Sequence, residues 1–318
     1  MGTRRQNSCD KDRIVGIRIA FSIAIMSLLT ACAGQPDVLE ARDAYATNGE
    51  VRIHYREMGS GPLIVFIHGF PDIWYTWRRQ MSALSKEYRT VAMDLRGYNL
   101  SDAPEGVDNY YYDDLEGDVL AVIHDLGEEQ AIIVGHDWGA AIAWRLATQH
   151  PEAVRRLVVC SVPHPQGLSR AIHKKDGALD YANRFIEAGA EKNFPPEWLS
   201  GWVKDPAVRE VYLEAFRRSD IRAMLNYYRA NFRSGPDMPE QVRLRNAIQW
   251  TPVRSPVLII FGEADPYLPV DGLNYSWEYV DRDLRIEVIQ DAGHFVQYDA
   301  PDKVTRSIRS WLADQQSE

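Results

Sequence analysis

The sequence predicts an α/β protein built on a mostly parallel, doubly wound sheet. Short, continuous apolar runs alternate with amphipathic stretches of helical length. Continuous apolar runs are typical of strands buried on both faces, and their alternation with helices is typical of a sheet covered on both sides. The expected buried strands are Leu63–Ile67, Thr90–Met93, Ala131–Val134, Leu157–Cys160, Val257–Phe261 and Ile286–Ile289.

The remaining elements follow from the same patterns. Residues 51–58 alternate at period two and predict an antiparallel edge strand. From residue 164 to about 239 no strand-like run occurs, although the sequence is aromatic and compatible with helices. We expect a helical cap at 164–239 above a core formed by 45–163 and 240–318, at the edge where open α/β sheets bind ligands. The core helices are expected at Ile73–Lys86, Tyr111–Leu126, Gly139–His150 and Pro301–Gln315.

Composition excludes several classes of protein. The 318 residues are 45% hydrophobic and 25% charged, which is typical of a globular chain. The 36 Lys and Arg residues against 45 Asp and Glu give a net charge of −9, so no basic surface for nucleic acid is expected. Three cysteines are too few for a disulfide scaffold.

The N-terminal segment has the pattern of an export signal. Five basic residues within positions 1–18 precede the uncharged run Ile19–Ala31, which is short for a membrane span. Leu29–Cys32 (LTAC) resembles a bacterial lipobox, which implies a signal peptide at 1–31, lipidation of Cys32 and a tether at 32–44. We therefore expect an exported, lipid-anchored protein of a bacterial cell envelope; a plain signal peptide, giving a periplasmic or secreted protein, is the alternative.

The strongest catalytic signal lies at residues 135–139. Gly135-His136-Asp137-Trp138-Gly139 joins an expected strand to an expected helix and has the Gly-x-nucleophile-x-Gly pattern of a nucleophile elbow. Small residues are needed two positions to either side because the backbone folds back tightly. An aspartate at the centre can attack carbon and form an ester. The alternative is that Asp137 only caps the following helix.

An acidic residue and a histidine follow in the chain order nucleophile, acid, histidine. Asp265 follows one expected strand and His294 follows the next, so both side chains are expected at the carboxyl edge of the sheet. A neutral histidine can activate water, and a carboxylate can orient it. Glu263 is the alternative acid.

The segment 66–71 is expected to contribute to an oxyanion hole. His68-Gly69-Phe70-Pro71 follows the first buried strand, and a glycine turn can direct a backbone N–H into the cleft. The amide of Phe70 would then pair with that of Trp138. A simple tight turn is the alternative.

Together these motifs resemble the α/β-hydrolase-fold epoxide hydrolases, which are close to haloalkane dehalogenases. The resemblance covers most of residues 45–315 and implies the α/β-hydrolase fold with a helical cap inserted after the sixth strand. It departs from the family at Asn99, where glycine is usual, and this change is expected to affect a turn. The motifs that carry it are His68-Gly69-Phe70-Pro71 with Trp74 and Trp77, Asp94-Leu95-Arg96-Gly97-Tyr98, Gly135–Gly139 and Asp291-Ala292-Gly293-His294.

The resemblance implies a hydrolase that adds water to a small apolar epoxide and releases a vicinal diol through an aspartyl ester. Asp137 would be the nucleophile, His294 with Asp265 would activate water, and two cap tyrosines would bind the epoxide oxygen. The family segments for these tyrosines match Tyr181 and Tyr228. Tyr227 is the fallback, and packing is the alternative for all of them.

Two other functions remain open at this stage. A haloalkane or haloacetate dehalogenase would use the same aspartate, but the first usually has asparagine where Phe70 stands and the second arginine where Trp138 stands. A non-catalytic envelope protein would not need the complete set of nucleophile, acid and histidine. No metal and no organic cofactor are implied, and the oligomeric state cannot be read from the sequence.

Overall fold

The computed structural model describes residues 38–172, 180–232, 240 and 247–315, with the backbone alone at 180 and 181. The predicted signal segment, Cys32 and the first part of the expected tether lie outside these residues. In the described part of the chain no helix is long and apolar enough to cross a membrane.

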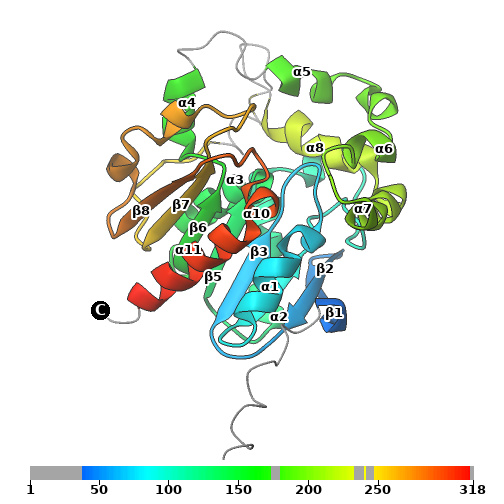
Figure 1. Ribbon diagram of the computed structural model, residues 1–318. Helices are drawn as coiled ribbons and strands as arrows, with labels where there is room; N and C mark the ends of the chain where they lie inside the picture. The colour runs from blue at the N-terminus through cyan, green and yellow to red at the C-terminus, as the bar shows by residue number, and fades with distance from the viewer. Residues whose placement is uncertain (1–37, 173–179, 233–239, 241–246, 316–318) are drawn as a thin grey trace, which may run out of the picture. The chain divides into compact units, whose positions relative to one another are not determined.

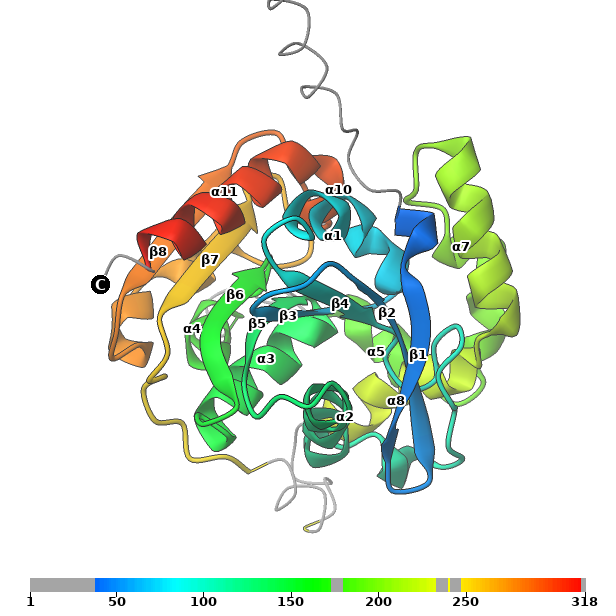
Figure 2. The same cartoon turned by 90° about the horizontal axis from the view of Figure 1, so that it is seen from below.

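One eight-stranded sheet forms the centre of the structure (Figures 1 and 2). Its order is β1-β2-β4-β3-β5-β6-β7-β8, and neighbouring strands are parallel except in the β1/β2 and β2/β4 pairs. The mostly parallel α/β-hydrolase sheet expected from the sequence is confirmed. The strands are β1 (Arg42–Asn48), β2 (Val51–Met58), β3 (Leu63–Ile67), β4 (Arg89–Met93), β5 (Ala131–His136), β6 (Val154–Cys160), β7 (Val257–Gly262) and β8 (Leu284–Ile289).

Helices cover both faces of the sheet. Helices α1 (Arg78–Leu84), α10 (Val296–Asp299) and α11 (Pro301–Asp314) lie on one face, and α2 (Tyr112–Asp125) and α3 (Trp138–Gln149) lie on the other (Figure 2). Side chains of β3 alternate between the two cores: Val65 and Ile67 pack toward α2 and α3, whereas Ile64 and Phe66 pack toward α1 and α11. All five residues of β3 are buried, which explains its continuous apolar run.

The insertion after the sixth strand is helical, as expected. Between β6 and β7 the described helices are α4 (Pro165–Ile172), α5 (Asp180–Ile186), α6 (Pro196–Leu199), α7 (Pro206–Arg218) and α8 (Ile221–Asn231). Helices α5 to α8 lie together beside one end of the sheet (Figure 1). Short 3-10 helices complete the chain: η1 (Val38–Glu40), η2 (Trp74–Trp77), η3 (Val107–Asn109), η4 (Ala190–Asn193), η5 (Val270–Leu273) and η6 (Ser276–Tyr279).

The structure differs from the sequence expectation at its first strand. Residues 42–44, expected to end the tether, belong to β1, which pairs with β2 and is the true edge. The strand expected at the edge, β2, is therefore second in the sheet. At the opposite edge lies β8, whose residues 286–289 were expected to be buried; Ile286 and Val288 are exposed because β8 has a neighbouring strand on one side only. Of the side chains of β1 only Ala46 is buried, so no apolar pattern marks the strand. Backbone pairing and surface ion pairs such as Arg56 with Asp43 hold it instead.

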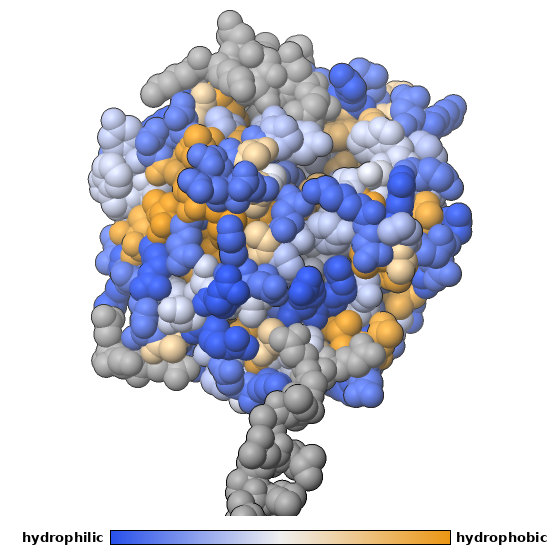
Figure 3. Space-filling model, viewed as in Figure 1, coloured by the Kyte–Doolittle hydropathy of each residue, from blue (hydrophilic) through white to orange (hydrophobic). Residues whose placement is uncertain are grey.

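The surface is mostly hydrophilic on the face drawn in Figure 3, although apolar areas interrupt it. This distribution is expected because the apolar strands lie between layers of helices. The largest fully buried side chains include three tryptophans, Trp77, Trp144 and Trp311.

Candidate active site

Asp137 occupies a sharp turn between β5 and α3. Its backbone has φ 52° and ψ −119°, a positive-φ conformation that residues other than glycine rarely adopt. A Cβ atom on Gly135 would lie 2.4 Å from the carbonyl oxygen of Gly139, and one on Gly139 would lie 2.2 Å from that of Ile67. The two glycines are therefore required by the turn. The Asp137 side chain makes no capping hydrogen bond to α3, so the helix-cap interpretation is wrong.

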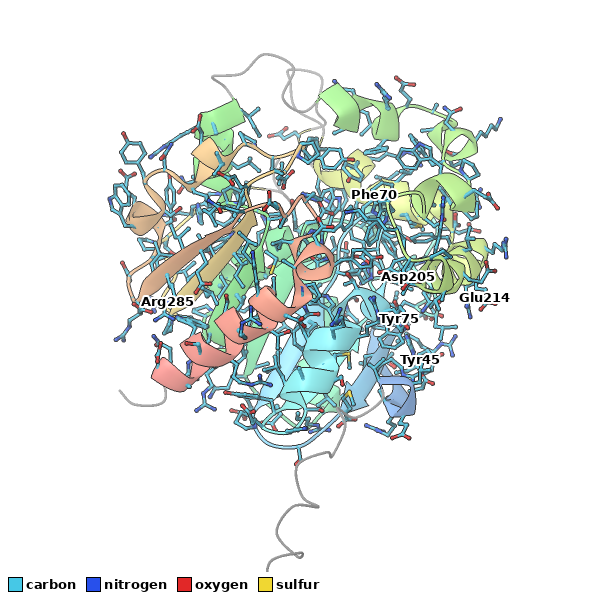
Figure 4. The ribbon with its side chains drawn as sticks, viewed as in Figure 1. Tyr45, Phe70, Tyr75, Asp205, Glu214 and Arg285 are labelled. Atoms are coloured by element: carbon cyan, nitrogen blue, oxygen red, sulfur yellow. The ribbon has the colours of Figure 1, made fainter. Side chains whose placement is uncertain are left out.

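The Asp137 carboxylate is held between a backbone amide and a histidine. Its Oδ1 atom accepts a hydrogen bond of 2.7 Å from the amide of Phe70, and its Oδ2 atom lies 3.3 Å from Nε2 of His294. Gly69 allows this approach, because a Cβ there would lie 2.3 Å from the Asp137 side chain. Phe70, labelled in Figure 4, follows β3 by three residues, and its amide is hydrogen-bonded to Asp137.

Asp265 orients the histidine from the end of β7. Its Oδ2 atom lies 2.8 Å from Nδ1 of His294, and its Oδ1 atom accepts hydrogen bonds from the amides of Tyr267 and Leu268 at 2.8 and 3.0 Å. The Asp265 carboxylate is fully buried, whereas Glu263 is exposed. Of the two acids considered from the sequence, the structure therefore places Asp265 beside His294.

The charges of these groups are coupled. Burial alone would lower the pKa of His294, but its hydrogen bonds to Asp137 and Asp265 and their negative charges raise it to about 10. Burial would raise the pKa of Asp137, but the hydrogen bond to His294, the positive charge there and the Phe70 amide lower it. At neutral pH the pair is therefore an imidazolium facing an ionised carboxylate.

A cavity of about 640 Å³ lies above Asp137 and His294. Its wall combines core residues with residues of α5, α6 and α8, and two charged side chains, Arg184 and Glu197, also line it. A volume in this range suits a small organic molecule. The lining is largely aromatic and includes Phe70, Phe185, Phe194, Trp198, Trp202, Tyr228, Tyr267 and Phe295.

The cap tyrosines differ in position. Tyr228 of α8 lines the cavity, and its ring packs edge-on against Trp138, with ring centres 5.0 Å apart. Tyr227 points away, because its buried hydroxyl donates to the carbonyl of Arg96 at 2.9 Å. Tyr181 lies in α5, but its side chain is outside the described residues.

Trp138 is the first residue of α3 and directly follows the nucleophile position. Its ring is buried among aromatic cap and core side chains, including Tyr228 and Tyr112. Within the described ranges, no group of three or more His, Cys, Asp or Glu side chains could hold a metal ion.

The unusual Asn99 affects a turn, as expected. Asn99 has φ 48°, a conformation that asparagine tolerates better than most residues. Its Nδ2 atom donates to Oδ2 of Asp94 at 2.7 Å, while Oδ1 of Asp94 accepts from the amide of Trp74 at 3.0 Å. The asparagine thus stabilises the Asp94 turn in a way that glycine could not.

Sequence reasoning missed a group of residues that connects the cap to the loops carrying Phe70 and His294. Buried Asp72 accepts hydrogen bonds from the Tyr212 hydroxyl at 2.7 Å and from Gln297 at 3.4 Å, and burial raises the pKa of Asp72 to about 7. Trp202 donates from Nε1 to the carbonyl of Pro71 at 3.1 Å and stacks on Phe295 at 3.7 Å. These partners are distant in the sequence, so no local pattern could reveal them.

Comparisons with known proteins identify the family of the chain. Residues 62–301 match the α/β hydrolase fold family. The chain is 34% identical to Epoxide hydrolase 1 of Caenorhabditis elegans over 87% of this chain and 72% of the relative, and 30% identical to Epoxide hydrolase 3 of Xenopus tropicalis over 90% and 80%.

The similar solved structures are also epoxide hydrolases. An epoxide hydrolase from Bacillus megaterium, crystallised in complex with an inhibitor, is 31% identical, with a TM-score of 0.77 over 85% of this chain and all of that one. The epoxide hydrolase VrEH1 from Vigna radiata is 29% identical, with a TM-score of 0.76 over 88% of this chain and all of that one. The chain therefore belongs to the α/β hydrolase fold family. Within it, the chain is a member of the epoxide hydrolases.

Proposed function

We propose that this protein adds water to an epoxide and releases a vicinal diol through an ester formed on Asp137. The observation that carries the proposal is the Asp137 carboxylate, which faces the Phe70 amide on one oxygen and His294 on the other inside a largely aromatic cavity. The relatives named as epoxide hydrolases support the same reaction.

In the first half-reaction Asp137 attacks one epoxide carbon. A bond forms between a carboxylate oxygen and that carbon, and the carbon–oxygen bond of the ring breaks. The departing oxygen becomes an alkoxide and takes a proton from a tyrosine hydroxyl. Tyr228 lines the cavity and is proposed for this role, with Tyr181 as the second tyrosine. Because the nucleophile is already ionised, no base is needed in this step.

In the second half-reaction His294 activates water. Once Asp137 is an ester it carries no charge, so the interaction that most raises the pKa of His294 is lost and the imidazole can release its proton. Neutral His294 then takes a proton from water, whose oxygen attacks the ester carbonyl. The amides of Phe70 and Trp138 are proposed to bind the resulting oxyanion. The ester bond breaks, the departing alkoxide takes the remaining proton of the water-derived hydroxyl, and the diol leaves while Asp137 returns as a carboxylate with one oxygen from solvent. The proton that His294 released before water attack restores the tyrosine hydroxyl.

The cavity supports a small apolar substrate. Its aromatic lining favours apolar or aromatic groups next to the epoxide ring. A related Bacillus megaterium enzyme was solved with a naphthyloxy-propanediol product, which has this character. The Tyr228 hydroxyl suits an oxygen leaving group, which favours an epoxide over a haloalkane as substrate.

Trapping the covalent ester tests the reaction. The variants His294→Ala and Asp137→Asn are mixed with styrene oxide and with 1,2-epoxyoctane, and intact-protein mass is measured. We expect the first variant to gain the mass of one epoxide and the second to gain none. The unchanged enzyme is assayed for diol with the same epoxides and for halide with 1-bromobutane and fluoroacetate. Halide release without diol formation would show a dehalogenase instead. If neither diol nor halide forms, the result supports a non-catalytic protein.

We also propose that the protein is exported and anchored by a lipid on Cys32. The support comes from the sequence: a basic segment, the uncharged run at 19–31 and the lipobox-like Leu29–Cys32. Expression of the full chain in a bacterium, followed by membrane fractionation and mass analysis of the mature N-terminus, tests this. We expect a diacylglyceryl cysteine at position 32 and release from the membrane fraction in Cys32→Ala. An unmodified mature N-terminus in the soluble periplasmic fraction would support the plain signal peptide instead.

A further inference from the structure

The backbone carbonyl of His294 accepts two side-chain hydrogen bonds. The Oγ atom of Ser161 donates at 2.6 Å, and Nε2 of His136 donates at 2.9 Å. Ser161 and His136 have no exposed surface, and His294 is 6% exposed. Two neutral donors on one buried carbonyl form a contact that water does not replace easily.

Ser161 adopts an unusual backbone conformation to make this contact. It directly follows β6 and has φ 62°, which is uncommon for any residue with a side chain. Its amide donates to the carbonyl of Ile260 in β7 at 2.9 Å, so the backbone is tied to the sheet while the hydroxyl points to His294. A strained serine at this position suggests that its hydroxyl has a specific task.

His136 acts from the end of β5, one position before the nucleophile. Its Nε2 atom donates to a carbonyl, whereas its buried Nδ1 atom has no hydrogen-bond partner, which favours the neutral ring with the proton on Nε2. Burial lowers the pKa of His136 to about 3, so the ring stays neutral beside the His294 imidazolium, 4.9 Å away between ring centres. It can therefore donate to the carbonyl without adding a competing charge.

The residue before His294 is held as well. The amide of Gly293 donates to Oδ2 of Asp299 at 3.0 Å, and a Cβ atom on Gly262 would lie only 2.1 Å from the carbonyl oxygen of Gly293. The loop thus packs closely against the end of β7. The hydrogen bonds of the Gly293 amide and of the His294 carbonyl, on either side of the Gly293–His294 peptide, fix the orientation of that peptide.

We propose that Ser161, assisted by His136, is a positioning residue for the hydrolytic half-reaction. Their hydrogen bonds fix the His294 backbone, while Asp265 fixes its ring at Nδ1. Together they keep Nε2 of His294 directed at the water that attacks the ester. Alkylation uses Asp137 and the tyrosines and does not need a precisely placed base. Removing the Ser161 hydroxyl therefore slows ester hydrolysis selectively. The inference rests on the proposed two-step function.

Single-turnover measurements on Ser161→Ala and Ser161→Gly test this. Glycine accepts φ 62° without strain, so that variant removes the hydroxyl and keeps the backbone conformation. Ser161→Cys restores a weak donor. The matched control is Ser255→Ala, because the Ser255 hydroxyl is also buried and donates to a carbonyl, that of Val154 at the start of β6. Alkylation is followed by tryptophan fluorescence, since Trp138 adjoins Asp137, and ester decay is followed by protein mass.

We expect both Ser161→Ala and Ser161→Gly to alkylate within about twofold of the unchanged enzyme and to hydrolyse the ester about tenfold more slowly, with Ser161→Cys between them. The Ser255→Ala variant keeps both rates. Equal slowing of the two half-reactions, or unchanged hydrolysis in Ser161→Gly, overturns the positioning role. If the wild-type enzyme forms no ester at all, the proposed function is wrong. This outcome differs from the two that contradict the positioning role of Ser161, so the experiment distinguishes them.

Discussion

The Nε2 atom of His294 lies 3.3 Å from the Oδ2 atom of Asp137, although the two residues are 157 positions apart. The nucleophile and the base of the proposed reaction are therefore in direct contact. The contact lowers the pKa of Asp137 and raises the pKa of His294, so each residue favours the charged form of the other. Formation of the ester interrupts this coupling, and several outcomes depend on it.

Replacement of Tyr228 by phenylalanine tests which of the two neighbouring tyrosines of α8, Tyr227 or Tyr228, donates a proton in alkylation. Tyr228→Phe removes the hydroxyl of a tyrosine that lines the cavity and is expected to slow alkylation about 10- to 100-fold, since the proposed donor to the departing oxygen is lost. Hydrolysis of the ester once formed is expected to change little. Stopped-flow alkylation and ester decay measure the two rates.

The adjacent Tyr227→Phe is the matched control. Its hydroxyl donates to the Arg96 carbonyl, so its loss is expected to lower the free energy of unfolding by about 1 kcal/mol and leave alkylation within a few-fold. If Tyr227→Phe slowed alkylation more than Tyr228→Phe, the catalytic hydroxyl would belong to Tyr227 instead.

Replacement of Asp265 by asparagine tests the orientation of the histidine. The asparagine side chain has the same shape as aspartate but lacks the charge that holds the proton on Nδ1 of His294. The rate of ester hydrolysis is therefore expected to fall at least about 100-fold. Accumulation of the ester in steady state, seen by protein mass, checks this. Glu263→Gln changes an exposed acid two residues away and should leave hydrolysis intact. The opposite order of effects would make Glu263 the functional acid.

The two half-reactions are expected to depend differently on pH. Because the pKa of Asp137 is lowered, its carboxylate stays ionised as the pH falls, and the alkylation rate should stay level down to about pH 5, above the ordinary aspartate pKa of about 3.9. Ester hydrolysis needs neutral His294, so its rate should fall as the pH decreases.

The apparent pKa of that hydrolysis step should lie below the value of about 10 in the free enzyme, since the ester no longer carries the Asp137 charge. Ester decay is measured between about pH 5 and pH 10 on protein alkylated at one fixed pH, a range that spans the ordinary histidine pKa of about 6.5. An apparent pKa that stays near 10 in the ester would contradict the proposed loss of coupling.

The contact between Asp72 and Tyr212 is expected to stabilise the cap on the core. Tyr212→Phe leaves a buried carboxyl with one donor fewer and should lower the free energy of unfolding by about 1–3 kcal/mol, measured by urea denaturation. Tyr45→Phe, on the exposed edge strand β1, is the control and should change it by less than about 0.5 kcal/mol. Equal effects would show that the Asp72 contact adds nothing specific.

The fold and the sharp turn at Asp137 could be predicted because their signals are local. Continuous apolar runs mark the buried strands, and glycines on either side of Asp137 mark a turn that only small residues allow. The order of Asp137, Asp265 and His294 along the chain indicated their meeting, since parallel strands bring their carboxyl ends to one edge. Strand β1 was not predicted, because only one of its side chains is buried and backbone pairing holds it.

By itself the sequence determined the class of fold and indicated Asp137 and His294 as the candidate nucleophile and base, since these rest on residue type and on position after a predicted strand. Only the tertiary structure decided that Asp265 rather than Glu263 faces His294, that Tyr228 rather than Tyr227 lines the cavity, and that Ser161 contacts the catalytic loop. The physical reason is that two residues of the same type, such as Tyr227 and Tyr228, or of the same charge, such as Glu263 and Asp265, lie in one short segment, so the local sequence does not distinguish them. Which of them is buried beside a distant partner depends on how separate elements pack.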